Sequence, residues 1–268
     1  MLKRITENVY VGANICNHGF VKTKEGVILI DTPAAPSAAL AWGKEVGVHG
    51  PLRYLINTEP HIDHFGGNYF FDAPVIAHEG ARQAMESVPL EYFMQLLGSA
   101  APGEALPEGF FFRLPEITFS QTLSLYAGDH TFRLLHMSGH TPFQSPVYVP
   151  EERVLFAGDD VVNGMPFFHE SVPEEWLHSL DALEEFDIDV VVPGHGEIGD
   201  KSLIKKMKNE VTTCINLVKE AVAKGMTLEG TLATVSFLDR YPQPGADEER
   251  RRFFERKSIT RLYEVLKG

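Results

Sequence analysis

The sequence predicts an α/β fold built as a four-layer αββα sandwich with additional helices at the C-terminus. Short apolar strands alternate with helical segments through most of the chain, which is typical of layered α/β architectures. The strand pattern of the first half is weakly repeated in the second half, and after His195 the pattern becomes helical. We expect residues 1–268 to form one domain, in which residues from about 201 to 268 are a helical extension.

Composition and charge narrow the class of protein. Of the 268 residues, 44% are hydrophobic and 23% are charged, which excludes a mostly disordered chain. No apolar run approaches the roughly 20 residues that a membrane helix needs, so we expect no membrane partner. The formal net charge of −13 disfavours nucleic acid as a partner, because an acidic chain repels phosphate backbones. A small-molecule substrate is expected instead.

The cysteine count and the N-terminus predict a cytoplasmic protein. The chain has two cysteines, Cys16 and Cys214, which are far apart and exclude a disulfide framework. They also exclude a zinc site held mainly by thiolates, whereas the 11 histidines offer many nitrogen ligands. No apolar segment of the signal-peptide type follows the basic pair Lys3-Arg4.

The predicted elements follow in order, and each half closes on an apolar strand that ends in aspartate. The first half predicts a helix over 38–46 and strands over 9–12, 19–22, 27–32, 53–57 and 74–78. The second half predicts strands over 131–135, 146–149 and 153–159. The hairpin that ends at Asp159 resembles the one that ends at Asp31. Two related halves of this kind, each a sheet with helices, give four layers.

Two long helices are predicted after His195. One apolar stripe with helical spacing is formed by Ile204, Met207, Val211, Ile215, Val218 and Val222. A second helix is expected over 246–267, and its charged run over 248–252 is interpreted as a solvated surface.

The segment between Val88 and Ser120 has no clear periodicity and is expected to be a long irregular loop with aromatic residues, among them Tyr92 and Phe110–Phe112. Such loops are often lids or binding loops. Two interpretations stay open. The segment forms an apolar wall over a functional site, or its aromatic residues anchor it to the core or to a second copy of the chain in a homodimer.

The chemically richest segment spans residues 58–68 and follows a predicted strand. Four potential metal ligands fall within six residues: Glu59, His61, Asp63 and His64. In an extended segment alternate residues point the same way, so Glu59, His61 and Asp63 are expected to converge.

Three further elements place a histidine or aspartate directly after glycine at the end of an apolar run. They contain His140, Asp159 and His195. Such positions lie at the mouth of a sheet, where loops present functional groups. Each element is weak alone, but the ordered set of four predicts a metal site made of His, Asp and Glu.

With these motifs in this order, residues from about 9 to 196 resemble the metallo-β-lactamase-fold hydrolase superfamily, which includes glyoxalase II, lactonases and the β-lactamases. The resemblance implies two divalent metal ions, with Zn²⁺ expected first and Mn²⁺ or Fe²⁺ as competitors. The first metal site is expected to use Glu59, His61 and His140, and the second Asp63, His64 and His195. Asp159 is expected to bridge the two ions, and Asp63 to act as the catalytic acceptor of a proton from the attacking water.

The chain departs from the family signature H-x-H-x-D-H at Glu59, which replaces the first histidine. Glu59 is either a true ligand, since carboxylates bind Zn²⁺ readily, or the mark of a weakened or empty site. The unchanged spacing favours a ligand. Three carboxylates facing two divalent ions leave a charge of +1, one unit below the usual site. We therefore expect a less Lewis-acidic pair whose bound water has a higher pKa, and stronger competition from Mn²⁺ or Fe²⁺.

The leading hypothesis for function is a metal-dependent hydrolase. A metal-bridging hydroxide would attack a small ester, thioester, lactone or amide, with β-lactams among the candidates. The N-terminus argues against a periplasmic β-lactamase, and no basic glutathione site is identifiable in the C-terminal helices. The alternative is an iron-dependent oxygenase or oxidoreductase on the same fold, such as a sulfur dioxygenase. The charge of −13 disfavours a nuclease or phosphodiesterase.

Other polar residues near the motifs are given supporting roles. Asp160 is expected to support the ligands or to lie on the surface. The segment from Met165 to His169 follows Asp159 closely and is expected near the same mouth, where His169 could contact a substrate, although a surface histidine is favoured. Four histidines without a motif are interpreted as structural: His78, His130, His136 and His178.

Overall fold

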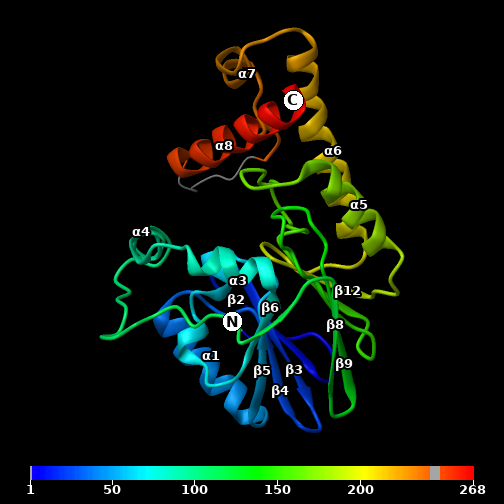
Figure 1. The fold of residues 1–268 in the computed structure, drawn as a ribbon. Coiled ribbons are helices and arrows are strands. Elements are labelled where there is room, and N and C mark those ends of the chain that lie inside the picture. The colour runs from blue at the N-terminus through cyan, green and yellow to red at the C-terminus, as the bar shows by residue number, and fades with distance from the viewer. Residues whose placement is uncertain (1, 242–247) are drawn as a thin grey trace.

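Two mixed β-sheets lie between helical layers in the computed structural model, which describes residues 2–241 and 248–268 (Figure 1). The first sheet contains, side by side and in this order, β1 (Lys3–Arg4), β2 (Val9–Ala13), β3 (Asn17–Thr23), β4 (Gly26–Ile30), β5 (Leu52–Ile56), β6 (Val75–His78) and β7 (Ile117–Phe119). Strands β1 to β4 pair antiparallel, whereas β4 to β7 pair parallel.

The second sheet contains β8 (Thr122–Ala127), β9 (His130–Leu135), β10 (Val147–Val149), β11 (Val154–Gly158) and β12 (Val190–Pro193), in the order β12-β11-β10-β9-β8. Its strands pair antiparallel except β11 and β12, which are parallel. Both sheets therefore have neighbouring strands whose carboxyl ends lie at the same edge, and loops from these ends can meet.

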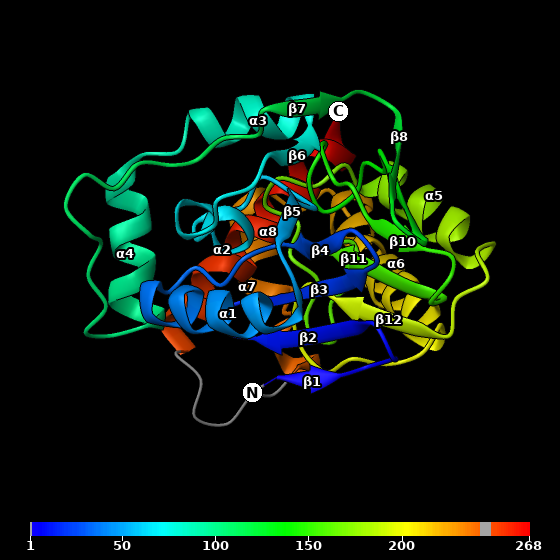
Figure 2. The same cartoon turned by 90° about the horizontal axis from the view of Figure 1, so that it is seen from below.

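Helices cover the outer faces of the sheets and one end of the sandwich (Figures 1 and 2). They are α1 (Pro36–His49), α2 (Ile62–Phe65), α3 (Glu79–Glu86), α4 (Leu90–Ala100), α5 (Pro173–Glu184), α6 (Ser202–Ala223), α7 (Leu228–Thr234) and α8 (Glu248–Lys267), with short 3₁₀ turns at Asn68–Phe70 and Leu238–Arg240. Within the described ranges, no helix combines the length and the apolar character that crossing a bilayer requires.

Buried apolar side chains fill the space between each pair of layers. Ile28 and Ile56 of the first sheet pack in one cluster with Phe132 and Phe156 of the second sheet. Trp42 on α1 joins a cluster on the outer face of the first sheet, and Trp176 on α5 joins one on the outer face of the second. Fully burying one such side chain contributes about 1.5–3 kcal/mol. These clusters lie between four successive layers of helix, sheet, sheet and helix. The predicted αββα class is confirmed.

The expected C-terminal helices are present as α6 and α8. The apolar stripe of α6 includes Ile204, Met207, Val211 and Val218, all buried against α5 and the second sheet. The second helix was predicted to begin at residue 246. Positions 246 and 247 lie outside the described residues, and α8 runs from Glu248 to Lys267.

The expectation of an irregular loop between Val88 and Ser120 is wrong in part, because α4 occupies residues 90–100. Phe93, Leu96 and Leu97 have helical spacing and are buried together. The helix is short, and the hydrophobic residues Tyr92 and Met94 on its exposed side obscure the alternation of polar and apolar faces. The helix is stabilised by the packing of its apolar face against the core. It is too short to give a clear periodic pattern in the sequence.

Candidate metal centre

The motif residues meet at the carboxyl ends of parallel strands from both sheets. Glu59 follows β5 closely, and the chain then enters α2. Asp159 directly follows β11, and His195 follows β12 after one glycine. His140 lies in the connection between β9 and β10. Ligands from two sheets thus converge on one end of the sandwich.

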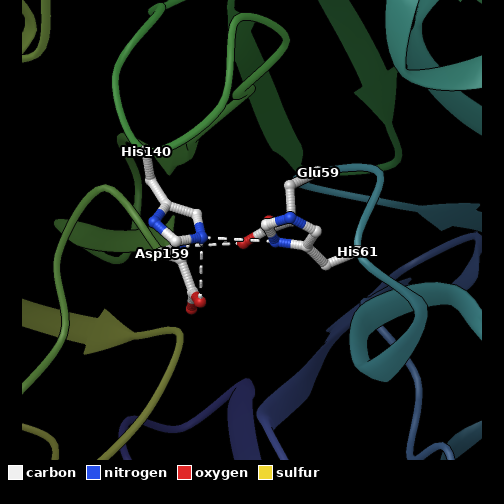
Figure 3. Close-up of side chains that lie close together, drawn as sticks. All are labelled: Glu59, His61, His140 and Asp159. Atoms are coloured by element: carbon white, nitrogen blue, oxygen red, sulfur yellow. Dashed lines mark hydrogen bonds and ion pairs between the residues drawn. The ribbon is translucent and has the colours of Figure 1, made fainter. Parts of the chain in front are cut away.

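The first group of potential ligands consists of Glu59, His61, His140 and Asp159, whose ligand atoms all lie within 4.8 Å of one another (Figure 3). Oε2 of Glu59 is 2.6 Å from Nδ1 of His61. Nε2 of His140 is 3.2 Å from Nδ1 of His61 and 3.6 Å from Oδ2 of Asp159. Glu59 is completely buried, and its Oε1 accepts the backbone N–H of Asp159 at 3.1 Å. The residue that departs from the family signature therefore points into the group.

The second group consists of Asp63, His64 and His195, whose ligand atoms also lie within 4.8 Å. Nε2 of His195 is 3.2 Å from Oδ2 of Asp63. Asp159 lies between the two groups, because its Oδ2 is 3.3 Å from Nε2 of His195 and its Oδ1 is 3.4 Å from Nε2 of His64. The structure thus brings together all seven residues chosen from the sequence, in the two sets expected, with Asp159 in contact with both.

Extended geometry alone predicted that Asp63 converges with Glu59 and His61, and that prediction is wrong, whereas the set implied by the family resemblance contains Asp63 with His64 and His195, as the structure does. Glu59 and His61 do share a group, but Asp63 belongs to the other. His61 is the last extended residue, with ψ 142°, and α2 begins at Ile62. A helical turn rotates each side chain by about 100° relative to the previous one, so the alternation of an extended chain stops before Asp63.

The two groups fit divalent cations. Nε2 of His64 and Oδ1 of Asp159 are buried 3.4 Å apart, and neither has a hydrogen-bond partner among the described residues. Leaving such a buried polar atom unsatisfied costs about 1–3 kcal/mol. A cation held by the imidazole nitrogens and carboxylate oxygens would satisfy these atoms, and this donor set suits Zn²⁺, Mn²⁺ and Fe²⁺.

Hydrogen bonds behind the ligands orient the imidazole rings. Nδ1–H of His64 donates to Oδ2 of Asp31 at 3.0 Å, which leaves Nε2 facing the centre. The Asp31 carboxylate also accepts the backbone N–H and the hydroxyl of Thr58, at 2.8 and 2.6 Å. Nδ1–H of His140 donates to the carbonyl of Phe167 at 2.8 Å. Such partners fix the ring and the tautomer of metal-binding histidines.

Sequence reasoning did not assign Asp31 to the site, although a signal existed. Asp31 closes the first apolar strand as Asp159 closes its counterpart in the second half. Its φ of 54° is unusual for a residue other than glycine, and such a backbone persists where surrounding contacts enforce it. The internal repeat therefore marked a supporting residue in one half and a potential ligand in the other.

Charges within the cluster shift several pKa values strongly. Burial and Asp159 raise the pKa of Glu59, but His64 and His61 outweigh them and lower it. Burial lowers the pKa of His195, but Asp159 and then Asp63 raise it to about 10. For Asp63, burial is outweighed by His64 and His195, and its pKa is lowered. In the absence of metal, a protonated His195 pairs with the carboxylates of Asp63 and Asp159.

Glycines before two of the histidines make room for carboxylates. A Cβ atom at Gly194 would collide with Oδ1 of Asp159, and one at Gly139 would collide with Oδ1 of Asp160. Asp160 is buried, its Oδ1 accepts the backbone N–H of His140 at 3.0 Å, and burial raises its pKa. Asp160 lies outside both ligand groups and supports His140, as expected.

The expectation that His169 is a surface residue is wrong. Its ring stacks on His61, with centroids 5.3 Å apart and planes 16° apart, and it lines the cavity at the metal centre. Burial, and then His140 and His61, lower the pKa of His169 to about 3. Glu170 places Oε2 3.5 Å from Nε2 of His61. The closeness of His169 to Asp159 in the sequence placed it near this mouth, but no motif marked His169 or Glu170 as part of the site.

Three of the four histidines interpreted as structural make local contacts, and the fourth, His178, lies on the surface. Nδ1 of His78 accepts the backbone N–H of Gly80 at 3.0 Å and caps α3. His130 lies 2.8 Å from Glu152, and His136 stacks on His78. His178 is exposed.

Five of the seven candidate ligands line a cavity of about 280 Å³: His61, Asp63, His140, Asp159 and His195. Tyr92 and Leu96 of α4 form part of its wall, which agrees with one of the two interpretations of this segment. The buried Phe93 also agrees with the other interpretation, an anchor to the core. Arg250 and Arg251 of α8 line the same cavity. The interpretation of the whole 248–252 run as a solvated surface is therefore wrong for these two positions.

A family model and several known proteins match this chain. The model described as the metallo-beta-lactamase superfamily matches residues 11–195. Human acyl-coenzyme A thioesterase MBLAC2 is 24% identical over 235 residues, which cover 78% of this chain and 83% of that protein. Hydroxyacylglutathione hydrolase from Thermosynechococcus vestitus is 28% identical over 163 residues, covering 60% and 54%. A linear primary-alkylsulfatase from Pseudomonas sp. is 32% identical over 216 residues, covering 66% and 40%.

Solved structures share the fold. A metallo-beta-lactamase from Pontibacter korlensis matches with a TM-score of 0.62 and 21% identity, over 79% of this chain and 98% of that chain. The sec-alkylsulfatase Pisa1 from Pseudomonas sp. matches with a TM-score of 0.76 and 16% identity, over 98% of this chain and 50% of that chain. At these identities the likeness concerns the fold.

Proposed function

Because the chain belongs to the metallo-beta-lactamase superfamily, we propose that it is a metal-dependent hydrolase of a small thioester or ester. The observation that carries this proposal is that two groups of His and carboxylate side chains lie together, with members of both groups lining one cavity. The sequence also left lactones and amides open. The names of two relatives, a thioesterase and a hydroxyacylglutathione hydrolase, favour a thioester among these candidates.

Two divalent ions, with Zn²⁺ as the first choice, form part of the proposal. Glu59, His61 and His140 would hold one ion, Asp63, His64 and His195 the other, and Asp159 would contact both. Ions bound in such a site lower the pKa of a coordinated water and polarise the carbonyl oxygen of a substrate.

The side chains supply orientation and proton transfer. Asp63 and His195 are partly exposed, at 19% and 33% of their side chains, and line the cavity where a substrate would lie. Asp63 accepts a proton from the attacking water and passes it to the departing sulfur or oxygen. The new bond joins the water oxygen to the acyl carbon, and the carbon–sulfur or carbon–oxygen bond breaks. The products are a thiol or an alcohol, a carboxylate and one proton.

Sulfate ester hydrolysis is the second candidate. Pisa1 matches 98% of this chain, so its likeness includes the C-terminal helices, whereas the Pontibacter lactamase matches 79%. The primary-alkylsulfatase adds 32% identity over 216 residues. None of the relatives named above is an oxygenase, and the iron-dependent oxygenase is not favoured. The cytoplasmic location and the homodimer contact stay predictions.

The test combines metal analysis with a substrate panel on the full chain. Protein purified without added metal is analysed for zinc, manganese and iron, stripped with a chelator, and reloaded with each metal. Thioester, ester, lactone, β-lactam, phosphodiester and alkyl sulfate substrates are then compared. We expect about two metal equivalents and thioester or ester turnover that chelation abolishes and metal restores. Chelator-insensitive turnover, or sulfate release without carboxylate release, would overturn the thioesterase proposal.

A further inference from the structure

The cavity at the metal centre has an apolar wall built from two helices that are distant in the sequence. Tyr92 and Leu96 come from α4, and Phe254 comes from α8. Phe167 also lines the cavity and lies edge-on to Phe254, with centroids 5.7 Å apart. In Figure 1, α8 (red) lies above α4 (blue-green), and the two helices are joined by a hydrogen bond between Arg250 and Ser99. An apolar part of a substrate can be enclosed between these walls.

Two arginines in the first turn of α8 add positive charge to this cavity. Arg250 and Arg251 line it together with the metal-centre residues. Nη1 of Arg250 donates to Oγ of Ser99 at the end of α4, 3.1 Å away, and its guanidinium lies over the Phe254 ring at 5.8 Å. Nη2 of Arg251 donates to the carbonyl of Tyr241. These contacts hold both half-buried side chains beside the cavity.

Guanidinium groups in this position suit an anionic ligand. A guanidinium stays charged at neutral pH and offers five donors in a planar fork that matches carboxylate and phosphate oxygens. The whole chain has a net charge of −13 and disfavours anions at a distance. The two guanidinium groups are therefore a local positive feature that favours anionic ligands inside the cavity.

The neighbouring Arg252 shows that not every arginine of this basic run lines the cavity. Its guanidinium bonds to Glu248, one turn earlier on α8, at 2.7 Å, and its side chain is 63% exposed. Arg252 does not line the cavity. The helix thus turns two of three consecutive arginines to the cavity and leaves the third on the surface.

We propose that Arg250 and Arg251 form an anion-binding rim, and that the substrate is a thioester or ester with an apolar segment and a separate carboxylate or phosphate group. This inference rests on the proposed function, because it names the substrate class of the same site. The scissile carbonyl lies at the metal centre, the apolar segment lies between α4 and α8, and the anionic group contacts the rim.

A binding experiment tests the rim without relying on turnover. Three hexyl thioethers, which cannot be hydrolysed, end in a hydroxyl, a carboxylate or a phosphate. Calorimetry measures their affinity for the zinc-loaded full chain and for the chelated full chain. We expect at least one anionic thioether to bind about tenfold more tightly than the hydroxyl compound, because charge-assisted hydrogen bonds are stronger than neutral ones. Comparing the two anionic ligands shows which group the rim prefers.

Arginine variants separate the rim from the metal centre. Arg251→Gln and Arg250→Gln are expected to remove most of the anionic preference, whereas the matched control Arg252→Gln keeps it. If the preference persists in Arg250→Gln/Arg251→Gln, or if Arg252→Gln loses as much as Arg251→Gln, the rim proposal is overturned. Equal binding of all three thioethers by the unchanged protein overturns it as well. Circular dichroism and thermal unfolding confirm that each variant is folded.

The same variants distinguish failure of the rim from failure of the proposed function. Hydrolysis of the three corresponding hexanoyl thioesters is measured on the zinc-loaded protein. If none of the thioesters is hydrolysed but the anionic thioethers still bind more tightly, the thioesterase proposal is overturned and the anion-binding role of the rim is retained. Hydrolysis of all three thioesters at equal kcat/KM would support the thioesterase proposal and overturn the rim proposal.

Discussion

At the scale of single residues, Glu59 has the greatest chemical consequence. It is completely buried, points into the first ligand group and accepts the backbone N–H of Asp159. This backbone hydrogen bond ties the loop after β5 to the loop after β11. A carboxylate at this position also lowers the charge of the ligand set by one unit relative to a histidine.

Replacing Glu59 with histidine tests that charge effect. In Glu59→His the metal centre gains one unit of positive charge, which stabilises a bound hydroxide. We expect the acidic-limb pKa of the kcat/KM profile to fall by about one unit. Profiles of both proteins are measured after reloading with the same metal. Glu59→Gln also removes the negative charge and should shift the pKa in the same direction. An unchanged or raised acidic-limb pKa in Glu59→His would contradict the charge argument.

Gly194 determines where Asp159 lies. A Cβ atom at position 194 would collide with Oδ1 of Asp159, so Gly194→Ala must displace that carboxylate. We expect metal affinity to fall by about 10–100-fold, the usual effect of disturbing groups around a metal ligand. A chelator competition titration measures it. The control Gly47→Ala on α1 places its Cβ in open space, and it should keep the affinity and gain about 0.5–1 kcal/mol of stability. Equal affinities in the two variants would refute the steric explanation.

At the scale of elements, α4 combines two roles that its sequence left open. Its inner face packs in the core cluster beside α2 and α3, and its other side contributes Tyr92 and Leu96 to the cavity wall. The Arg250–Ser99 hydrogen bond joins its end to α8. Anchoring and lining are thus performed by different faces of one helix.

Adjacent residues on α4 test how much its inner face stabilises the fold. Phe93 is completely buried, whereas Met94 is 59% exposed. Phe93→Ala should lower the free energy of unfolding by about 3–5 kcal/mol, and Met94→Ala should change it by less than about 0.5 kcal/mol. Urea unfolding of the metal-free proteins measures both. If Phe93→Ala does not fold, the milder Phe93→Leu is used. Similar losses for Phe93 and Met94 variants would mean that α4 is not anchored through this face.

At the scale of the whole molecule, the metal centre connects the two sheets. Ligand candidates follow β5 of the first sheet and β11 and β12 of the second. In the metal-free protein these loops are joined by ion pairs such as His195 with Asp63 and Asp159. In the proposed metal-bound state, coordination bonds would replace these pairs and link the loops of both halves.

This exchange predicts proton release. The pKa of His195 is raised to about 10, so the metal-free protein holds this proton at pH 7, whereas a metal ligand must be a neutral imidazole. Metal binding at pH 7 should therefore release protons, and apparent metal affinity should rise with pH toward 10. Titration calorimetry in buffers of different ionisation enthalpy measures the release.

The metal-free protein should show the matching stability change. Because its folded-state pKa is raised, His195 stabilises the metal-free fold fully below its unfolded pKa of about 6.5. This contribution is lost as pH rises through the folded pKa of about 10. His195→Gln should lose this part of the pH dependence. Metal binding without proton release at pH 7 would contradict the charged state assigned to His195.

The sequence by itself determined the strand pattern, the αββα class and the seven residues that converge. These features depend on local periodicity and on fixed spacing within short motifs. They can therefore be predicted without knowing which distant segments are in contact. The repeated strand ending at Asp31 and Asp159 belongs here too, although only one of the two residues was assigned to the site.

Tertiary structure decided what surrounds the converging residues and where the extended segment after β5 ends. The start of α2 at Ile62 placed Asp63 in the second group, and the fold brought His169 against His61. The first turn of α8 met α4 across the cavity and placed Arg250 and Arg251 there. These arrangements arise from packing between segments more than 100 residues apart, or from a change of backbone geometry within one residue. Neither leaves a periodic or motif-like trace in the sequence.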